Sequence, residues 1–132
     1  MIIDTSALIA ILLGEPEAEL FAHAIAAAPQ RLVSTFTALE TGIVIEAKKG
    51  ELGGRELDLL IHRAKIEIVP LTADQLEIAR SAWRKYGKGR HPAGLNIGDC
   101  CSYALAKSAG KPLLFKGGDF SQTDLEAVHW RS

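Results

Sequence analysis

The sequence contains only two cysteines, and these are adjacent, at Cys100 and Cys101. Neighbouring cysteines rarely bridge each other, so a disulfide framework is not expected. No apolar run approaches the roughly 20 residues that a membrane-spanning helix needs. The amino end reaches an acid at Asp4 and has no basic segment of the kind that opens a signal peptide. These absences predict a reduced, cytoplasmic protein.

A strong net charge is also missing. The 132 residues carry a net charge of −1, which argues against a generally basic nucleic-acid binder. With 48% hydrophobic residues the chain is long enough for a core of its own, so we expect one domain over residues 1–132. The charges are nevertheless segregated, because residues 1–47 hold six acids and one base, whereas residues 78–98 hold five bases and no acid. An acidic pocket beside a basic rim suits a polyanionic ligand.

Strand-like and helix-like segments alternate along the chain. Strands are expected at residues 2–3, 32–34, 66–69 and 112–116, with a final edge strand at 127–130. Helices are expected at 6–13, 17–28, 37–49, 55–65, 72–86 and 96–108, the third ending at Gly50 and the fifth opening with a Thr72–Gln75 capping box. This alternation predicts a mainly parallel α/β sheet of four to five strands, with helices on both faces. Ligands bind such sheets outside the carboxyl ends of the strands.

Four carboxylates stand in four separate segments, each at a strand end or on the inner face of a helix: Asp4, Glu40, Asp99 and Asp119. Burying several carboxylates together is costly unless a cation or protons neutralise them. Mg²⁺ and Mn²⁺ take oxygen ligands and neutralise carboxylates at neutral pH. None of the four histidines has the spacing of a metal ligand set or of a catalytic base. The pattern therefore predicts a metal-dependent phosphodiesterase.

Asp4 and Glu40 each have a simpler interpretation as well. Asp4 opens the run Asp-Thr-Ser, in which each residue is able to cap a helix, so a cap alone explains it. Glu40 shares a helical face with apolar Phe36, Ile43, Val44 and Ala47, where a solvated acid is out of place. A partly buried acid paired with a base is the alternative there.

Asp99 and Asp119 are similarly ambiguous when each is considered alone. Asp99 lies in the first turn of its helix, where the dipole favours a negative charge. Asn96 either caps that helix or orients Asp99, and Gly98 permits a close backbone approach. Asp119 follows an apolar strand and two glycines, which is also the composition of a plain turn.

Five segments together resemble the PIN domain, and more narrowly the VapC toxins of bacterial toxin–antitoxin pairs. They are Asp4–Leu8, Thr37–Glu40, Tyr86–His91, Asn96–Cys100 and Leu114–Phe120. The resemblance covers essentially the whole chain, and all four acidic positions of the family are filled. One departure is Gly118, where many relatives carry a polar or acidic residue.

The resemblance implies a three-layer α/β/α PIN-like fold and an Mg²⁺- or Mn²⁺-dependent endoribonuclease. In that arrangement Asp4, Asp99 and Asp119 hold the metal, and Glu40 is a further ligand or the base for the attacking water. Outer-shell roles fall to Thr5, Ser6 and Asn96. It also implies a homodimer that a VapB-type antitoxin holds inactive, in part by presenting a basic residue to the acidic pocket.

Five bases are candidates for phosphate contacts that position RNA: Arg84, Lys85, Lys88, Arg90 and Lys116. A solvated helix face explains most of them equally well. Trp83 and Tyr86 are placed to stack a base, or else to contribute to the core or a dimer contact.

Other functional classes account for fewer of these residues. A phosphoacceptor receiver domain needs paired acids after its first strand and an aspartate ending its third, yet Asp4 is single and residues 66–69 run into Pro70. A non-catalytic metal- or protein-binding module needs only some of the four acids. A metal nuclease acting on DNA uses the same acids and is the nearest alternative.

Overall fold

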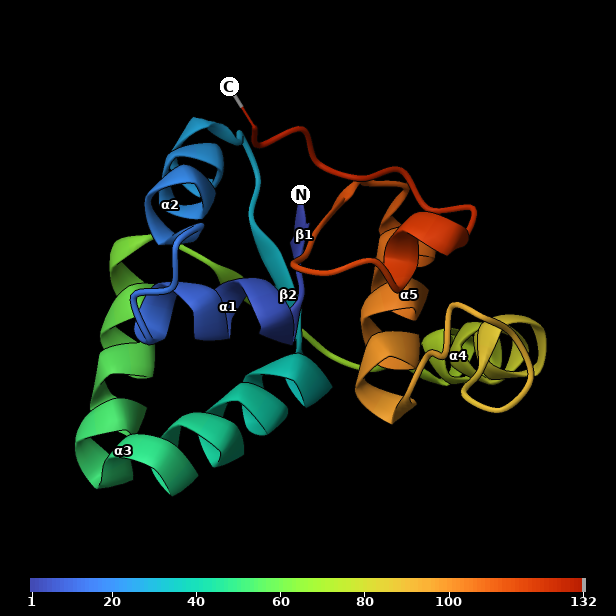
Figure 1. Cartoon of the computed structure of the whole chain (residues 1–132), viewed down its shortest axis with the longest axis horizontal. Coiled ribbons are helices and arrows are strands. Elements are labelled where there is room, and N and C mark those ends of the chain that lie inside the picture. The colour runs from blue at the N-terminus through green and yellow to red at the C-terminus, as the bar shows by residue number, and fades with distance from the viewer. Residues whose placement is uncertain (132) are drawn as a thin grey trace.

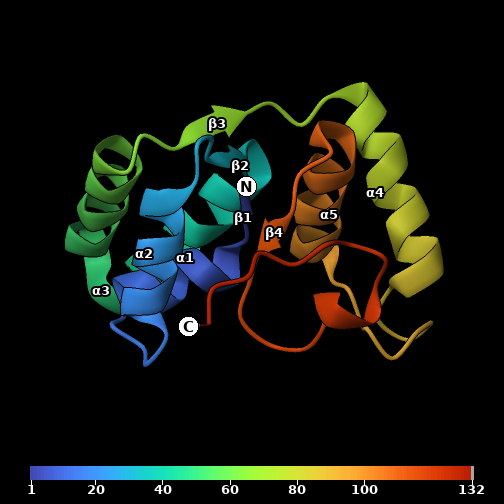
Figure 2. The same cartoon turned by 90° about the horizontal axis from the view of Figure 1, so that it is seen from above.

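The protein is described from a computed structural model, in which residues 1–131 are placed. A four-stranded parallel sheet with the order β3-β2-β1-β4 forms its centre (Figure 2). The strands are β1 (Ile2–Ile3), β2 (Leu32–Ser34), β3 (Glu67–Val69) and β4 (Leu113–Leu114). The predicted α/β class with a parallel sheet is confirmed. None of the helices in residues 1–131 combines the length and apolarity needed to span a bilayer.

Helices cover both faces of the sheet. The helices are α1 (Thr5–Leu12), α2 (Ala18–Ala27), α3 (Thr35–Arg63), α4 (Ala73–Tyr86) and α5 (Ile97–Ala109), followed by the short 3-10 helix η1 (Phe120–Gln122). Figures 1 and 2 show α1, α2 and much of α3 on one side, with α5 and then α4 on the other. The arrangement is the predicted three-layer sandwich.

Side-chain alternation along the strands divides the core in two. Ile2 pairs in register with Leu32 and Leu113, and all three face the core that α4 and α5 cover. Ile3 and Leu114 point the opposite way, into the core beneath α1 and α2. Because neighbouring residues of a strand face opposite sides, two-residue strands are enough to join both layers.

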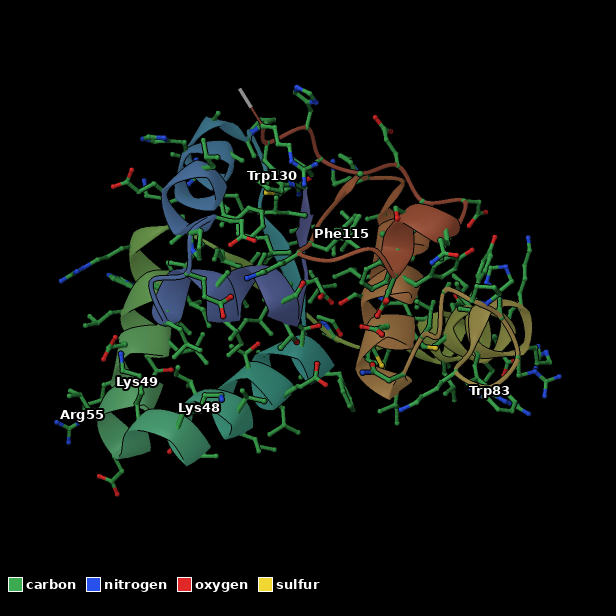
Figure 3. All side chains as sticks on the ribbon, in the orientation of Figure 1. Lys48, Lys49, Arg55, Trp83, Phe115 and Trp130 are labelled. Carbon is green, nitrogen blue, oxygen red and sulfur yellow. The ribbon has the colours of Figure 1, made fainter. Side chains whose placement is uncertain are left out.

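α3 differs from its prediction. Two helices were expected, at 37–49 and 55–65, but helix runs from Thr35 to Arg63 and leaves helical geometry only at Gly50 (φ 68°). Gly53 lies inside the second half, where an added Cβ would stand 2.8 Å from the Ile45 carbonyl oxygen. The glycines therefore permit a sharp bend with close packing rather than a loop, and Figure 3 shows Lys48, Lys49 and Arg55 around that bend.

Two local predictions need correction. The expected edge strand at 127–130 is a single bridge between Ala127 and Leu113, because Trp130 leaves the sheet and packs edge-on against Phe21 of α2, with 4.7 Å between ring centroids. At α4, Thr72 does cap the helix, but the Gln75 side chain donates to the Pro70 carbonyl instead of reaching back.

Candidate active site

Asp4 is both a helix cap and a buried acid. It directly follows β1, and its side chain is only 4% exposed. Oδ2 accepts from the Ser6 backbone N–H at 3.0 Å and from the Ser6 hydroxyl at 2.7 Å, while Oδ1 accepts from the Ser102 hydroxyl at 2.7 Å. The expected helix cap is therefore present, and the same carboxylate is buried. These hydrogen bonds hold the carboxylate in one orientation.

Thr5 and Ser6, the outer-shell candidates beside Asp4, connect it to other segments. The Thr5 hydroxyl donates to Oε1 of Glu40 at 2.6 Å. The Ser6 hydroxyl, besides donating to Asp4, accepts from the Lys116 backbone N–H at 2.9 Å. Through these contacts the start of α1 is joined to α3 and to the segment after β4.

Glu40 is half-buried on α3, and its carboxylate lies against the first turn of α5. A Cβ added at Gly98 would stand 2.4 Å from Oε1 and 2.5 Å from Oε2, so only glycine leaves room for the carboxylate. The free N–H groups of a helix start attract anions, which favours an acid there. The apolar face predicted for α3 is partly wrong, because Ile43 is 62% exposed while Thr41 and Ile45 are buried. α3 presents a mixed face to its neighbours, and periodicity alone does not show which face they cover.

Asp99 and Asn96 form a complete capping box at the start of α5. The Asn96 side chain accepts from the Asp99 N–H at 2.8 Å, and Asp99 Oδ2 accepts from the Asn96 N–H at 3.0 Å. Burial, together with the nearby charges of Asp4, Asp119 and Glu40, outweighs this hydrogen bond and raises the pKa of Asp99 to about 6. The other three predicted acids therefore lie close enough to Asp99 to repel its negative charge.

Asp119 is the exposed member of the four and stands at the start of η1, without a capping hydrogen bond from its side chain. Figure 3 shows Phe115, just after β4, between α1 and α5. Its ring packs against Phe120 at 5.3 Å between centroids and so anchors η1. Beyond η1, Asp124 accepts from the Tyr103 hydroxyl at 2.7 Å and from Lys107 Nζ at 2.6 Å. Two anchors thus hold the loop that carries Asp119, and Asp124 is occupied as one of them.

The chemistry of this site fits a hard divalent cation. Four carboxylates meet at one edge, a glycine makes room for one of them, and the pKa of Asp99 is raised by the other three as well as by burial. Within residues 1–131, however, no three acid, cysteine or histidine side chains already converge on one metal position.

The predicted basic residues divide into two groups. Arg84 and Lys88 line an apolar groove of about 700 Å³ that extends to Asn96 and Ile97 beside the acids. Arg90 stacks on Trp83 at 4.6 Å, and Lys85 approaches the ring of buried Tyr86 at 5.1 Å. Trp83 of α4, in contrast, is 46% exposed (Figure 3) and is one of the residues that line the groove.

Lys116 is committed to other partners. Its Nζ lies 3.0 Å from Glu15 and 3.2 Å from Glu17 in the connection between α1 and α2. The hydrogen bond to Glu15, with a second to Glu17, raises the pKa of Lys116. These contacts leave Lys116 less available to phosphate than Arg84 and Lys88.

Sequence reasoning missed Ser102, which contacts Asp4 although 98 positions separate the two. The signal was present, since Ser102 and Tyr103 carry the only hydroxyls in the otherwise apolar run from Cys100 to Ala106. A hydroxyl on the buried side of a helix needs a partner. The identity of that partner depends on how α5 crosses β1, which no local pattern encodes.

Comparison with known proteins agrees with the fold and the family that the sequence motifs indicated. The model of the PIN domain family matches residues 1–126. Ribonuclease VapC of Mycolicibacterium smegmatis is 62% identical, over 98% of this chain and 100% of that protein. Ribonuclease VapC30 of Mycobacterium tuberculosis is 60% identical, over 97% of this chain and 98% of its own length.

Solved structures agree on the fold. VapC20 of Mycobacterium tuberculosis, described as a toxin that cleaves the sarcin–ricin loop, superposes with a TM-score of 0.78 at 21% identity, covering 97% of this chain and 98% of that one. VapBC2 of Rickettsia felis, solved bound to a DNA fragment from its promoter, gives a TM-score of 0.74 at 16% identity, with 97% and 96% covered.

Proposed function

This chain belongs to the PIN-domain family and, within it, to the VapC ribonucleases of toxin–antitoxin systems, and from that premise we propose that it is a metal-dependent endoribonuclease that hydrolyses RNA phosphodiester bonds. One observation carries the proposal. Asp4, Glu40, Asp99 and Asp119 come from four segments and meet at one edge of the sheet, where burial and mutual repulsion raise the pKa of Asp99 to about 6. Such a set of oxygen ligands suits Mg²⁺ or Mn²⁺.

In this proposal Asp4, Asp99 and Asp119 hold the cation, with Glu40 beside them. The bound ion supplies Lewis-acid stabilisation of the charge that develops on the phosphoryl oxygens. Asp4 enters the reaction already oriented, because Ser6 and Ser102 fix both of its oxygens. Asn96 fixes one oxygen of Asp99 in the same way.

Glu40 is the proposed base for the attacking water. Its Oε1 is occupied by the Thr5 hydroxyl, which leaves Oε2 to accept a proton from water. The water oxygen then forms a bond to phosphorus while one bridging P–O bond breaks, and the departing ribose oxygen is protonated from solvent. The absence of a side chain at Gly98 leaves room for the Glu40 carboxylate at the start of α5.

RNA is expected to follow the basic rim of the groove. Arg84 and Lys88 lie beside Asn96, so phosphate contacts there would align a strand with the acids without reading its sequence. Trp83 offers an exposed aromatic face on which an unpaired base stacks. The RNA target is not encoded in these contacts.

A VapB-type antitoxin and a second copy of the chain are the proposed protein partners. Two of the solved structures that share the fold are toxin–antitoxin complexes from Rickettsia felis and Haemophilus influenzae. On this chain, large apolar side chains remain exposed on α3, α4 and α5, including Leu39, Ile43, Leu76 and Ile97. An exposed apolar surface of this kind is typical of a protein-binding face.

The decisive test is cleavage of total cellular RNA by the purified chain with Mg²⁺ or Mn²⁺. Discrete fragments are expected, and EDTA, Asp4→Asn and Asp99→Asn should each abolish them. Asp74→Asn is the matched control, since Asp74 is an exposed acid at the start of α4, outside the site. Cleavage of DNA but not of RNA would show that DNA, and not RNA, is the substrate. If the folded chain, free of antitoxin, cleaves neither, the proposed catalytic activity is refuted.

A further inference from the structure

Two buried hydroxyls lie behind Asp4, and neither belongs to one of the proposed metal ligands. Ser102 on α5 and Thr37 on α3 are both fully buried, with 0% exposure. The Ser102 hydroxyl lies 2.7 Å from Asp4 Oδ1 and 3.3 Å from the Thr37 hydroxyl. The three residues therefore form a continuous chain from α3 through α5 to the end of β1.

The direction of this chain follows from the chemistry of its members. The Ser102 hydroxyl has a single proton and donates it to Asp4 Oδ1. The oxygen of Ser102 is then an acceptor, and Thr37 is the donor to it. Each bond in such a chain polarises the next, so Thr37 strengthens the hold of Ser102 on Asp4.

Counting acceptor positions shows what this hold does to Asp4. A carboxylate offers about four lone-pair positions in all. The Ser102 hydroxyl, the Ser6 N–H and the Ser6 hydroxyl fill three of them. About one position is left for a cation, which restricts Asp4 to contact through one oxygen.

We propose that Ser102 is a positioning residue, which fixes the plane of the Asp4 carboxylate and so sets the affinity of the site for its divalent ion. Thr37 supports Ser102 in that role. The inference rests on the metal-dependent function proposed above. It assigns Ser102 no contact with RNA, since the side chain has no exposed surface.

Direct binding of Mn²⁺ to the full chain, measured by calorimetry without RNA, tests this inference. Ser102→Ala is expected to weaken Mn²⁺ binding about 10- to 100-fold, as partners of metal ligands usually do. Thr37→Val, which keeps the shape and removes the hydroxyl, is expected to weaken it by about two- to fivefold, the effect of one modest hydrogen bond. At saturating Mn²⁺, kcat of Ser102→Ala should remain lowered while KM for RNA is unchanged.

Thr41→Val is the matched control. Thr41 lies on α3 one turn after Thr37 and is equally buried, but its hydroxyl has no hydrogen-bond partner within residues 1–131. The same substitution there should leave Mn²⁺ binding and cleavage unchanged.

Each other outcome has a defined meaning. Unchanged Mn²⁺ affinity in both Ser102→Ala and Thr37→Val overturns the inference. If circular dichroism shows that Ser102→Ala does not fold, the comparison of Thr37→Val with Thr41→Val decides, and equal affinities overturn the inference. A wild-type chain that binds no Mn²⁺ refutes the proposed metal site itself, which separates that failure from the failure of the Ser102 role alone.

Discussion

Gly98→Ala should lower RNA cleavage strongly without destabilising the fold. The new Cβ would stand 2.4 Å from Oε1 of Glu40, whereas ordinary contact begins at 3.4 Å. The Glu40 carboxylate must therefore retreat by about 1 Å, and a displacement of that size at a reacting group costs on the order of 100-fold in rate. The backbone gains from the change, because Ala is favoured over Gly in a helix by up to about 1 kcal/mol.

Two measurements on the same protein separate these effects. Initial rates of cleavage at saturating Mn²⁺ should fall by about two orders of magnitude, while the thermal midpoint stays level or rises. Gly54→Ala is the matched control, since its Cβ would press against another acid, with Glu46 Cδ at 2.9 Å, outside the site. It should cleave at the wild-type rate. Wild-type activity in Gly98→Ala would show that the position of Glu40 against α5 does not matter, and would refute the reasoning.

Asp99, Asp124, Lys88 and Lys116 provide independent tests. Because the pKa of Asp99 is raised to about 6 from 3.8, the folded chain binds more protons between those values, so metal-free stability falls as pH rises through them. Thermal melting measured over a series of pH values should show that fall in stability, and Asp99→Asn should remove it. RNA cleavage should be lost below about pH 6, and a higher Mg²⁺ concentration should move the midpoint of that loss to lower pH. Asp124→Ala frees the loop carrying Asp119 from α5 and should cost about tenfold in Mn²⁺ affinity with little change in melting; unchanged affinity would contradict the anchoring role. Lys88→Ala should reduce the salt dependence of RNA binding by about one phosphate contact. Lys116→Ala, which removes the contacts with the α1–α2 connection, should change the melting temperature instead. The reverse result would assign the phosphate contact to Lys116 and the structural role to Lys88.

The sequence predicted most reliably what local chemistry determines. Asn96 and Thr72 were found as helix starts because a cap satisfies backbone groups within the same turn. The strands were found because β-sheet residues lie between turn signals. The expectation that Asp4 and Asp119 lie at the same edge of the sheet followed from the parallel class, since the carboxyl ends of parallel strands lie together. The placement of Glu40 and Asp99, which lie on helices, did not follow from that argument.

What sequence reasoning missed depends on contacts between distant segments. Residues 51–54 were left outside the helices because glycine usually ends one, but packing of Gly53 against Ile45 compensates for the low helix propensity. Lys116 was predicted to contact phosphate because it is a base close to Asp119 in the sequence. Only the fold brings Glu15 and Glu17 close enough to pair with it. Ser102 was overlooked for the same reason, because its partner lies at the opposite end of the chain.

The strand order has a consequence for the synthesis of the protein on the ribosome. β1 lies between β2 and β4, and the Asp4 N–H donates to the carbonyl of Leu114, so the first strand is incomplete until nearly the last residues arrive. At roughly 5 to 20 residues per second, translation from Asp4 to Asp119 takes about 6 to 23 seconds. During that interval the growing chain lacks Asp119, and for most of it also lacks α5, so the set of four acids is incomplete. The complete set of four acids, and with it the proposed activity, therefore exists only when synthesis of the chain is almost finished.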